Sequence, residues 1–375
     1  MGQPATSKSA VSLPHEGRLW LICAVGLWLV GWWKSINLIV LLAWVMLALL
    51  LLSWFLARRM TYLVRVEREP IESTYVGSPV QIRYRLSAQT RFDAVGFWVE
   101  DNLGGVTLRR FVARLPAGQT QTIAIDFVPQ KRGRVRTDGL MIVSQYPFGI
   151  LTARLWVKDR FEAIFWPRTG TLHTARLLRW LARRTRGDGR SHCPRRALVA
   201  QDADSHSVRP YRPGDSMRWI HWRTSARCGE LMVRESDEKA TTELVLVVEP
   251  RPGPALEALL SLAATICREW LRHPANKLTL IIARAVVETH TGKTDPETAR
   301  RYLDRLAVEQ GGEPAELQDL LEAVTAVIVG RAVPVLYLTS EYSERHASQA
   351  SGRLVRPIAW LTPEQASEFY TPPAG

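Results

Sequence analysis

An apolar stretch near the start of the chain decides the fold. Residues 19–57 read LWLICAVGLWLVGWWKSINLIVLLAWVMLALLLLSWFLA, and Lys34 is the single charge among these 39 residues. At about 1.5 Å per residue, a helix of this length measures close to twice the ~30 Å hydrocarbon core of a bilayer. We therefore predict a transmembrane helical hairpin within residues 18–60, with spans over about 19–33 and 38–57 and a tight turn at 34–37.

The charges around the two spans predict their orientation. Lys34 lies alone in the turn, whereas six cations flank the outer ends: Lys8, Arg18, Arg58, Arg59, Arg65 and Arg68. Because Lys and Arg are enriched on the cytoplasmic side, we expect a multi-pass protein of the cell (inner or plasma) membrane, with membrane lipid as a partner. Its N-terminal tail, residues 1–17, and its soluble domains are then cytoplasmic. A cleaved signal peptide is the alternative, but Gly31-Trp32-Trp33-Lys34 lacks a small-x-small cleavage pattern.

Length and composition set the bounds for the rest of the chain. The 375 residues suffice for two or three domains, and 46% hydrophobic with 23% charged residues excludes a disordered or collagen-like chain. The net charge of +13 requires an anionic partner, which is nucleic acid, lipid headgroups or an acidic protein. The four cysteines, Cys23, Cys193, Cys228 and Cys267, are too few and too scattered for a disulfide framework.

The hydrophobic period changes to two in residues 61–167. Apolar and polar residues alternate over Val80–Leu86 and nearly so over Thr122–Val128, and turn residues such as Gly77-Ser78-Pro79 recur at short intervals. Short alternating strands with such breaks predict an antiparallel β-sandwich. Nothing in it resembles a nucleophile–base pair, so we expect an interaction or spacer module.

An arginine-rich bridge, residues 168–208, follows the predicted sandwich. Between 168 and 196 the only acid is Asp188, against Arg168, Arg176, Arg179, Arg183, Arg184, Arg186, Arg190, Arg195 and Arg196. A groove for nucleic acid would also present aromatic stacking residues among the arginines, and only Trp180 is there. We therefore expect a solvated basic face or loop near anionic lipid, and not a nucleic-acid site.

The densest motif lies in residues 209–235. Residues 209–227 read RPYRPGDSMRWIHWRTSAR, in which Pro213-Gly214 predicts a turn and Asp215 the cap of a helix from Ser216 to Arg227. Trp219, Trp222 and Ala226 would form one apolar face of this helix, Gly229 would end it, and Glu230–Glu235 reads as a strand.

This pattern resembles the bacterial family known as domain of unknown function 58, the membrane-anchored partners of MoxR-type AAA+ ATPases. The matching residues are Arg209, Tyr211, Gly214, Asp215, Arg218, Ile220, Trp222, Ala226, Arg227 and Leu231. Lys131-Arg132-Gly133-Arg134 and Tyr146-Pro147-Phe148-Gly149 are similar to a second signature of that family. The resemblance implies a membrane hairpin, a β-rich spacer, a von Willebrand factor A-like domain and a MoxR-type AAA+ ATPase as neighbour, but no established activity.

Several roles are open to the motif. We expect a structural or partner-binding cluster, made of Arg209, Tyr211, Gly214, Asp215, Arg218, Trp222 and Arg227. One alternative is an anionic-ligand site read by Arg209, Arg218 and Arg227, and another is an acid–base set that includes Asp215, His221 and Ser225. A zinc site from His192, Cys193, His206, His221 and Cys228 lacks paired ligand spacing.

Residues 236–375 predict an α/β domain. Glu243–Val248 reads as a strand buried on both faces. A helix follows from Pro254, with an apolar stripe of Leu256, Leu259, Leu260, Ala263, Cys267 and Trp270. Further strands are predicted near 278–283, 324–330, 333–339 and 355–360, with helices near 296–310 and at the C-terminus. Strands that alternate with helices are typical of an α/β sheet.

The resemblance also bears on metal binding. A von Willebrand factor A domain often binds a divalent cation through Asp-x-Ser-x-Ser after its first strand, where this chain has Glu249-Pro250-Arg251-Pro252-Gly253. The hydroxyl ligands are absent, and Arg251 brings a cation in their place, so the site at Glu249, Arg251 and Gly253 is degenerate. We expect neither a metal nor another cofactor.

The sequence favours a binding protein over an enzyme. It contains no G-x-x-x-x-G-K-[ST], H-E-x-x-H or G-x-S-x-G motif. We expect a non-enzymatic membrane-anchored scaffold or adaptor whose cytoplasmic α/β domain binds protein partners, and the resemblance implies a MoxR-type AAA+ ATPase as one of them. The alternatives are a hydrolase or transferase that uses Asp215, Arg218, His221 and Arg227, or a lipid or nucleic-acid regulator that uses the 168–196 arginine run.

Overall fold

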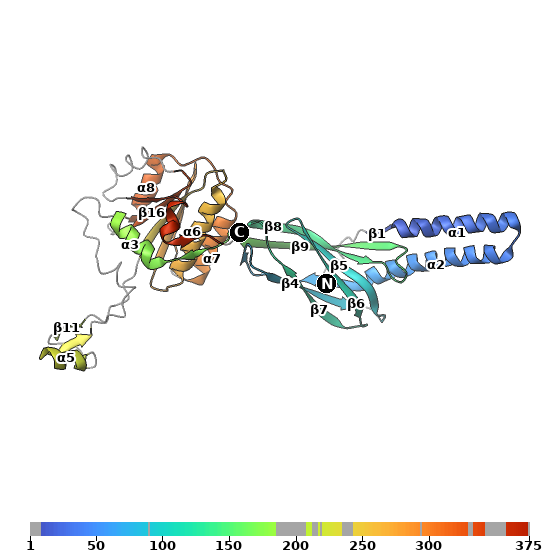
Figure 1. The fold of residues 1–375 in the computed structure, drawn as a ribbon, viewed down its shortest axis with the longest axis horizontal. Coiled ribbons are helices and arrows are strands. Elements are labelled where there is room, and N and C mark those ends of the chain that lie inside the picture. Colours follow the sequence, from blue (N-terminus) through green and yellow to red (C-terminus); the bar gives the residue numbers. More distant parts are fainter. Residues whose placement is uncertain are drawn as a thin grey trace. The chain divides into compact units, whose positions relative to one another are not determined.

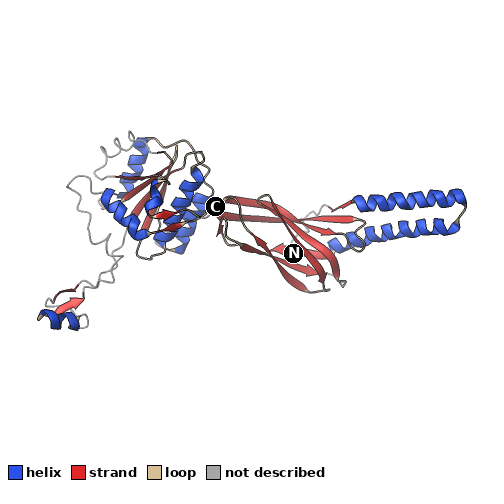
Figure 2. Ribbon diagram, viewed as in Figure 1, coloured by secondary structure: helices blue, strands red, loops and turns tan. Residues whose placement is uncertain are grey.

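The computed structural model describes residues 9–88, 91–184, 208–211, 217, 220–234, 243–292, 295–328, 333–341 and 358–373. The chain divides into two compact units, Met1–Phe165 and Trp166–Gly375. The first unit contains a helical hairpin and antiparallel strands, and the second contains an α/β sheet (Figures 1 and 2). The chain is therefore a mixed α/β protein with many antiparallel strands, as predicted.

Residues 15–62 form the two helices predicted from the apolar stretch. α1 (His15–Lys34) and α2 (Asn37–Tyr62) are joined by Ser35 and Ile36, and Ser35 takes a left-handed conformation with φ of 53°. The helices lie side by side (Figure 1), and the indole Nε1 of Trp20 donates to the Met46 carbonyl oxygen at 3.1 Å. Among the described residues, α2 is the one helix long and apolar enough to cross a membrane.

Two antiparallel sheets form the β-sandwich predicted for residues 61–167. The larger has the order β1-β9-β8-β5-β6, with β3 also paired to β9, and the smaller has the order β2-β4-β7. Tyr84, Phe97 and Ile142 are among the side chains of both sheets that are fully buried in one core. The strands are β1 (Ser9–Ser12), β2 (Val64–Arg68), β3 (Thr74–Tyr75), β4 (Val80–Ala88), β5 (Ala94–Leu103), β6 (Val106–Leu115), β7 (Thr120–Phe127), β8 (Gly133–Ser144) and β9 (Thr152–Trp166).

The N-terminal residues correct one prediction. Residues 9–12, expected within a tail at 1–17, form β1 and pair antiparallel with β9, Ser9 opposite Leu155 and Ser12 opposite Thr152. At the other end of the hairpin, α2 leads through Leu63 into β2, which belongs to the smaller sheet. This strand was not predicted because residues 9–12 are too few to show a two-residue hydrophobic period. Both ends of the hairpin therefore join the same sandwich.

A five-stranded sheet with the order β15-β14-β13-β16-β17 is the centre of the second unit. β13 (Glu243–Glu249), β14 (Lys277–Ala283), β16 (Val335–Thr339) and β17 (Ile358–Leu361) are parallel, and β15 (Val287–His290) is an antiparallel edge. The apolar run of β13 is buried because the strand lies mid-sheet, and the predicted stripe on α6 (Leu256–Leu271) is buried as well. α7 (Pro296–Ala307) and α8 (Leu317–Ile328) complete the set of longer helices described after β13.

Two predictions in residues 236–375 are wrong. The strand expected near 324–330 falls in α8, because Leu317, Leu320, Leu321 and Val324 repeat at helical spacing and pack into the core. The expected C-terminal helix is a four-residue 3-10 turn, Gln365–Glu368, followed by β18 (Tyr370–Thr371).

The start of the arginine-rich bridge is also more ordered than predicted. β10 (Thr171–Leu172) pairs with β18, and α3 (Thr174–Arg184) buries Leu177, Leu178 and Leu181. The helix forms because its apolar residues recur at helical spacing while its arginines occupy the opposite face. Trp180 is 7% exposed and contacts the Phe369 ring at 5.6 Å between centroids, so it is not a stacking surface for bases. The rest of the bridge, up to residue 207, lies outside the described residues.

Candidate functional site

The signature motif forms a small module in residues 208–234. β11 (Val208–Pro210) pairs antiparallel with β12 (Met232–Arg234), and α5 (Trp222–Cys228) lies between them in sequence. The Ser225 hydroxyl accepts a hydrogen bond from the Met232 N–H at 2.8 Å and so ties the helix to the strand. Gly229 ends α5 in the left-handed conformation, as predicted, and donates its N–H to the Ser225 carbonyl.

The module's helix begins later than predicted. Ile220 forms an antiparallel bridge with Val233, and the His221 ring caps α5 by accepting the Thr224 N–H at 3.2 Å. Because the bridge holds Ile220 out of a helix, the prediction of one unbroken helix from Ser216 to Arg227 is wrong, and α5 begins at Trp222. Asp215, the predicted cap, lies outside the described residues. Trp222, expected to pack on an apolar face, is 67% exposed.

The structure describes only some of the predicted site residues. Tyr211 is half-buried and donates its N–H to the Leu231 carbonyl at 2.7 Å, and Arg227 lies exposed in the last turn of α5. Arg209 lies on β11 opposite Val233. Gly214, Asp215 and Arg218 lie outside the described residues, as do His192, Cys193 and His206 of the zinc alternative. Within the described ranges, no group of three or more His, Cys, Asp and Glu side chains could hold a metal ion.

The hydrogen bonds of the module are those of a structural element. Ser225 Oγ lies 3.1 Å from the backbone carbonyl of His221, so its hydroxyl contacts the main chain at that residue. The hydroxyl beside the ring is that of Thr224, 2.8 Å from His221 Nδ1, and the same nitrogen accepts the Thr224 N–H. This is the geometry of a helix N-cap, in which the side chain of the first residue contacts the residue three positions later. His221 Nδ1 therefore has a structural role.

A second candidate site lies at the carboxyl ends of β13 and β16. The chain leaves β13 toward β14 on one side of the sheet, and β16 and β17 are added on the other side. Such a reversal of strand order leaves a crevice at the carboxyl edge, which is where open α/β sheets bind ligands. A cleft of about 400 Å³ lies here, and Arg251, Pro252, Pro254, Glu313, Pro314 and Glu341 are among the residues that line it.

A buried carboxylate pairs with Arg251 beside this cleft. Glu249, the last residue of β13, is 5% exposed, and its Oε1 lies 2.7 Å from Arg251 Nη2. The Tyr337 hydroxyl on β16 donates to Glu249 Oε2 at 2.9 Å. On the exposed side, Arg251 Nη1 lies 3.3 Å from Glu341 Oε2. The guanidinium therefore bridges a buried and an exposed carboxylate at the mouth of the cleft.

This arrangement shifts two pKa values. Burial raises the pKa of Tyr337, and the negative charge of Glu249 raises it further, so the hydroxyl stays protonated and continues to donate. Burial lowers the pKa of Arg251, but the hydrogen bond and charge of Glu249 outweigh it, so the pKa rises above its usual value. Arg251 is thus a permanent cation just after the end of β13.

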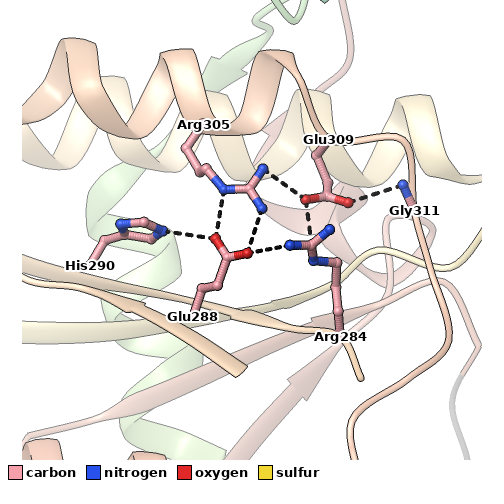
Figure 3. Close-up of polar contacts among 6 residues, drawn as sticks. All are labelled: Arg284, Glu288, His290, Arg305, Glu309 and Gly311. Carbon is pink, nitrogen blue, oxygen red and sulfur yellow. Dashed lines mark hydrogen bonds and ion pairs between the residues drawn. The ribbon is translucent and has the colours of Figure 1, made fainter. Parts of the chain in front are cut away.

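One wall of the cleft is held by a second charged network, shown in Figure 3. The Glu309 carboxylate, at the end of α7, contacts Arg305 Nη1 at 3.1 Å and accepts the Gly311 N–H at 3.1 Å. Arg305 Nε also lies 2.8 Å from Glu288 Oε2 on β15, and Arg284 contacts both carboxylates. Hydrogen bonding from Arg305 lowers the pKa of Glu288 to about 2, with the charges of both arginines adding to the effect.

The network positions the loop that lines the cleft. Gly311 has φ of 85°, and a Cβ there would lie 3.0 Å from the Pro252 backbone nitrogen, so the two loops touch. The Gly312 N–H donates to the Pro250 carbonyl at 2.9 Å. Sequence reasoning found Glu249 and Arg251 but missed Tyr337 and Glu341, and it missed the network of Arg284, Glu288, Arg305 and Glu309. The i,i+4 spacing of Arg305 with Glu309 and of Arg284 with Glu288 was visible as a signal. The contacts between these two pairs join separate elements and show no such signal.

Comparisons with known proteins give a family match for part of the chain. Residues 207–355 match the family described as "Protein of unknown function DUF58". The match begins at the module, includes the cleft, and confirms over this part of the chain the resemblance noted in the sequence.

One curated relative also matches the chain, over a short segment. Over 69 residues the chain is 35% identical to the uncharacterized protein YeaD of Bacillus subtilis, which is 18% of this chain and 17% of that protein. A solved CARDB domain from Pyrococcus furiosus covers 28% of this chain and 94% of its own length at 9% identity, with a TM-score of 0.21. An exo-β-N-acetylglucosaminidase from Vibrio harveyi covers 77% of this chain and 59% of its own length at 8% identity, with a TM-score of 0.20. TM-scores this low carry no argument about fold or function.

Proposed function

We propose that this protein is a non-enzymatic, membrane-anchored scaffold whose α/β domain binds a protein partner at the carboxyl-edge cleft. The observation that carries the proposal is the cleft itself, about 400 Å³ in volume at the reversal of strand order, with Arg251 and Glu341 at its mouth. A surface of both charge signs beside three prolines suits a polypeptide better than a small anion.

The proposal includes a von Willebrand factor A-like fold for the second unit. Numbered within the domain, the sheet has the order 3-2-1-4-5, and strand 3 is antiparallel to strand 2. That order with parallel neighbours supports a doubly wound sheet, in which the binding edge is the carboxyl edge. The Arg251–Glu249 pair then replaces the cation, so partner binding needs no metal.

Membrane anchoring through two crossings is a further part of the proposal. α2 has the length and apolarity of a span, and α1 runs back along it. β1, before α1, and β2, after α2, both belong to the sandwich of the first unit. If α2 crosses a bilayer, then α1 must cross back, because a folded sandwich cannot have strands on both sides. The cations at the outer ends favour the cytoplasm as that side.

The resemblance noted in the sequence implies a MoxR-type AAA+ ATPase as neighbour, and we propose such an ATPase as the partner. The test is binding of such an ATPase from the same genome to the full-length protein in nanodiscs. Glu341→Lys reverses a charge at the cleft mouth, where the side chain is 77% exposed. The matched control is Glu243→Lys at the opposite end of β13, where Glu243 pairs with Lys277 at 3.0 Å. We expect Glu341→Lys to weaken binding at least tenfold, a loss of about 1.4 kcal/mol, and the control to bind like wild type.

Two results would contradict the proposal. Equal binding by both variants would exclude the cleft as the partner site. Turnover of an acyl or phosphoryl substrate by the purified protein would contradict the non-enzymatic assignment.

A further inference from the structure

One end of the β-sandwich carries the helical hairpin together with two loops. Strand pairing places them there: Val64, just after α2, lies opposite Ala88 at the end of β4, and Ser12, just before α1, lies opposite Thr152 at the start of β9. Because β4 ends and β9 begins at this edge, the loops at 91–93 and 145–151 lie beside the hairpin. We call these two loops the hairpin-side rim.

Contacts join the rim to both helices. The Arg59 guanidinium, in the last turns of α2, lies over the Phe92 ring at 4.2 Å from its centroid. At the first turn of α1, a Cβ on Gly17 would lie 2.0 Å from the Ile150 carbonyl oxygen, so the helix and the 145–151 loop are in direct contact. Only glycine permits this approach. These contacts hold the rim beside the first turn of α1 and the last turns of α2.

The rim holds two aromatic side chains outward. Phe92 is 56% exposed and Phe148 is 55% exposed. The loop around Phe148 is well built: Tyr146 packs on Gly96 of β5, the Gly149 N–H donates to the Gln145 carbonyl at 2.8 Å, and Gln145 Nε2 donates to Thr152 Oγ1 at 3.2 Å. The exposed rings of Phe92 and Phe148 are therefore part of an ordered surface.

From these contacts we infer that the hairpin-side rim is a membrane-interface contact in which Phe92 and Phe148 enter the lipid headgroup layer. The inference rests on the proposed membrane anchoring. The apolar residues 38–57 of α2 measure about 30 Å, which is one hydrocarbon core, so Arg58 and Arg59 reach the headgroups. Phe92 lies against Arg59, at the same depth, where aromatic rings beside cations are favoured. The rim thus adds a second attachment that restrains the sandwich against the bilayer.

The experiment measures the depth of single positions in full-length protein. Cys23→Ser, Cys193→Ser and Cys228→Ser remove the other cysteines, and Cys267, which is fully buried in α6, is left in place. Phe148→Cys or Phe92→Cys is then labelled with NBD in nanodiscs of phosphatidylcholine and phosphatidylglycerol. The matched control is Phe111→Cys, which is 48% exposed in mid-strand on β6. Leu51→Cys, 64% exposed on α2, reports on anchoring itself.

We expect headgroup spin-labelled lipid to quench NBD at 148 and 92 at least about twofold more than at 111, with a blue-shifted emission. Quenching at 148 and 92 equal to that at 111, while tail-labelled lipid quenches position 51, would overturn the rim and leave the anchoring intact. Loss of quenching at 51 as well would overturn the anchoring on which the rim depends.

Discussion

Protonation of Glu288 should lower the free energy of unfolding of the second unit, and the contacts of its carboxylate with Arg305 give the size of the effect. Its carboxylate accepts two hydrogen bonds from Arg305, at 2.8 and 3.0 Å, and the pKa falls from 4.5 to about 2. A shift of this size corresponds to at most about 3 kcal/mol of stability at neutral pH. Because the side chain is 31% exposed, solvent screens the pair, and we expect about 1–2 kcal/mol.

The sign of the pH dependence follows from the lowered pKa. The stabilisation is fully present above about pH 4.5, the pKa in the unfolded chain, and is lost as pH falls toward 2, with roughly half gone by pH 3. Glu288→Gln removes the charge at every pH. It should therefore be less stable than wild type at pH 7, and the difference should shrink at pH 3.

The measurement is urea unfolding of the full-length protein in non-ionic micelles, with the second unit followed by hydrogen exchange of the β13 and β14 amides. Glu322→Gln, on the exposed side of α8, is the control and should unfold like wild type at both pH values. A Glu288→Gln midpoint equal to that of wild type at pH 7 would refute the reasoning. So would a difference that stays constant down to pH 3.

Three further substitutions test the packing. Tyr337→Phe removes the hydroxyl that donates to buried Glu249 and should cost about 1–3 kcal/mol, measured by the same urea unfolding. Trp270→Ala, at a fully buried position in α6, should cost about 3–5 kcal/mol in that assay. Gly17→Ala cannot fit against the 145–151 loop and should increase hydrogen exchange there, whereas Gly26→Ala, with open space around its Cβ position, should not; equal exchange in the two would show that α1 does not contact the loop.

Much of the fold was predictable because its signals are local. The apolar length of residues 19–57 predicted two helices, and the alternation around Val80–Leu86 predicted a strand of the sandwich. The continuous apolar run after Glu243 predicted the central strand β13, because a strand that is covered on both faces is apolar at successive positions. Each of these patterns is continuous in the sequence.

The errors arose where tertiary contacts decide the outcome. Residues 324–330 contain β-branched residues that favour a strand, but the apolar spacing from Leu317 gives α8 more buried surface as a helix. Local preference predicted one unbroken helix through residues 216–227, whereas the bridge from Ile220 to Val233 keeps Ile220 out of it and His221 caps α5. No local pattern predicts that pairing.

The candidate site was predicted only in part. The sequence identified Glu249 and Arg251 as a degenerate metal position, and the structure pairs the two side chains, of which Arg251 lines the cleft. Tyr337 and Glu341 could not be found, because they are about ninety residues away and reach Glu249 and Arg251 only through the pairing of β13 with β16.

The central claim, a membrane anchor that presents the cleft to a cytoplasmic partner, is tested most directly by the sidedness of two positions. Single cysteines are placed at Ser35, in the turn of the hairpin, and at Glu341, at the cleft mouth, in the cysteine-depleted chain. A membrane-impermeant thiol reagent is added to cells with an intact plasma membrane. The account predicts labelling of Ser35→Cys in intact cells and of Glu341→Cys only after permeabilisation. Labelling of Glu341→Cys in intact cells would place the cleft outside and contradict it.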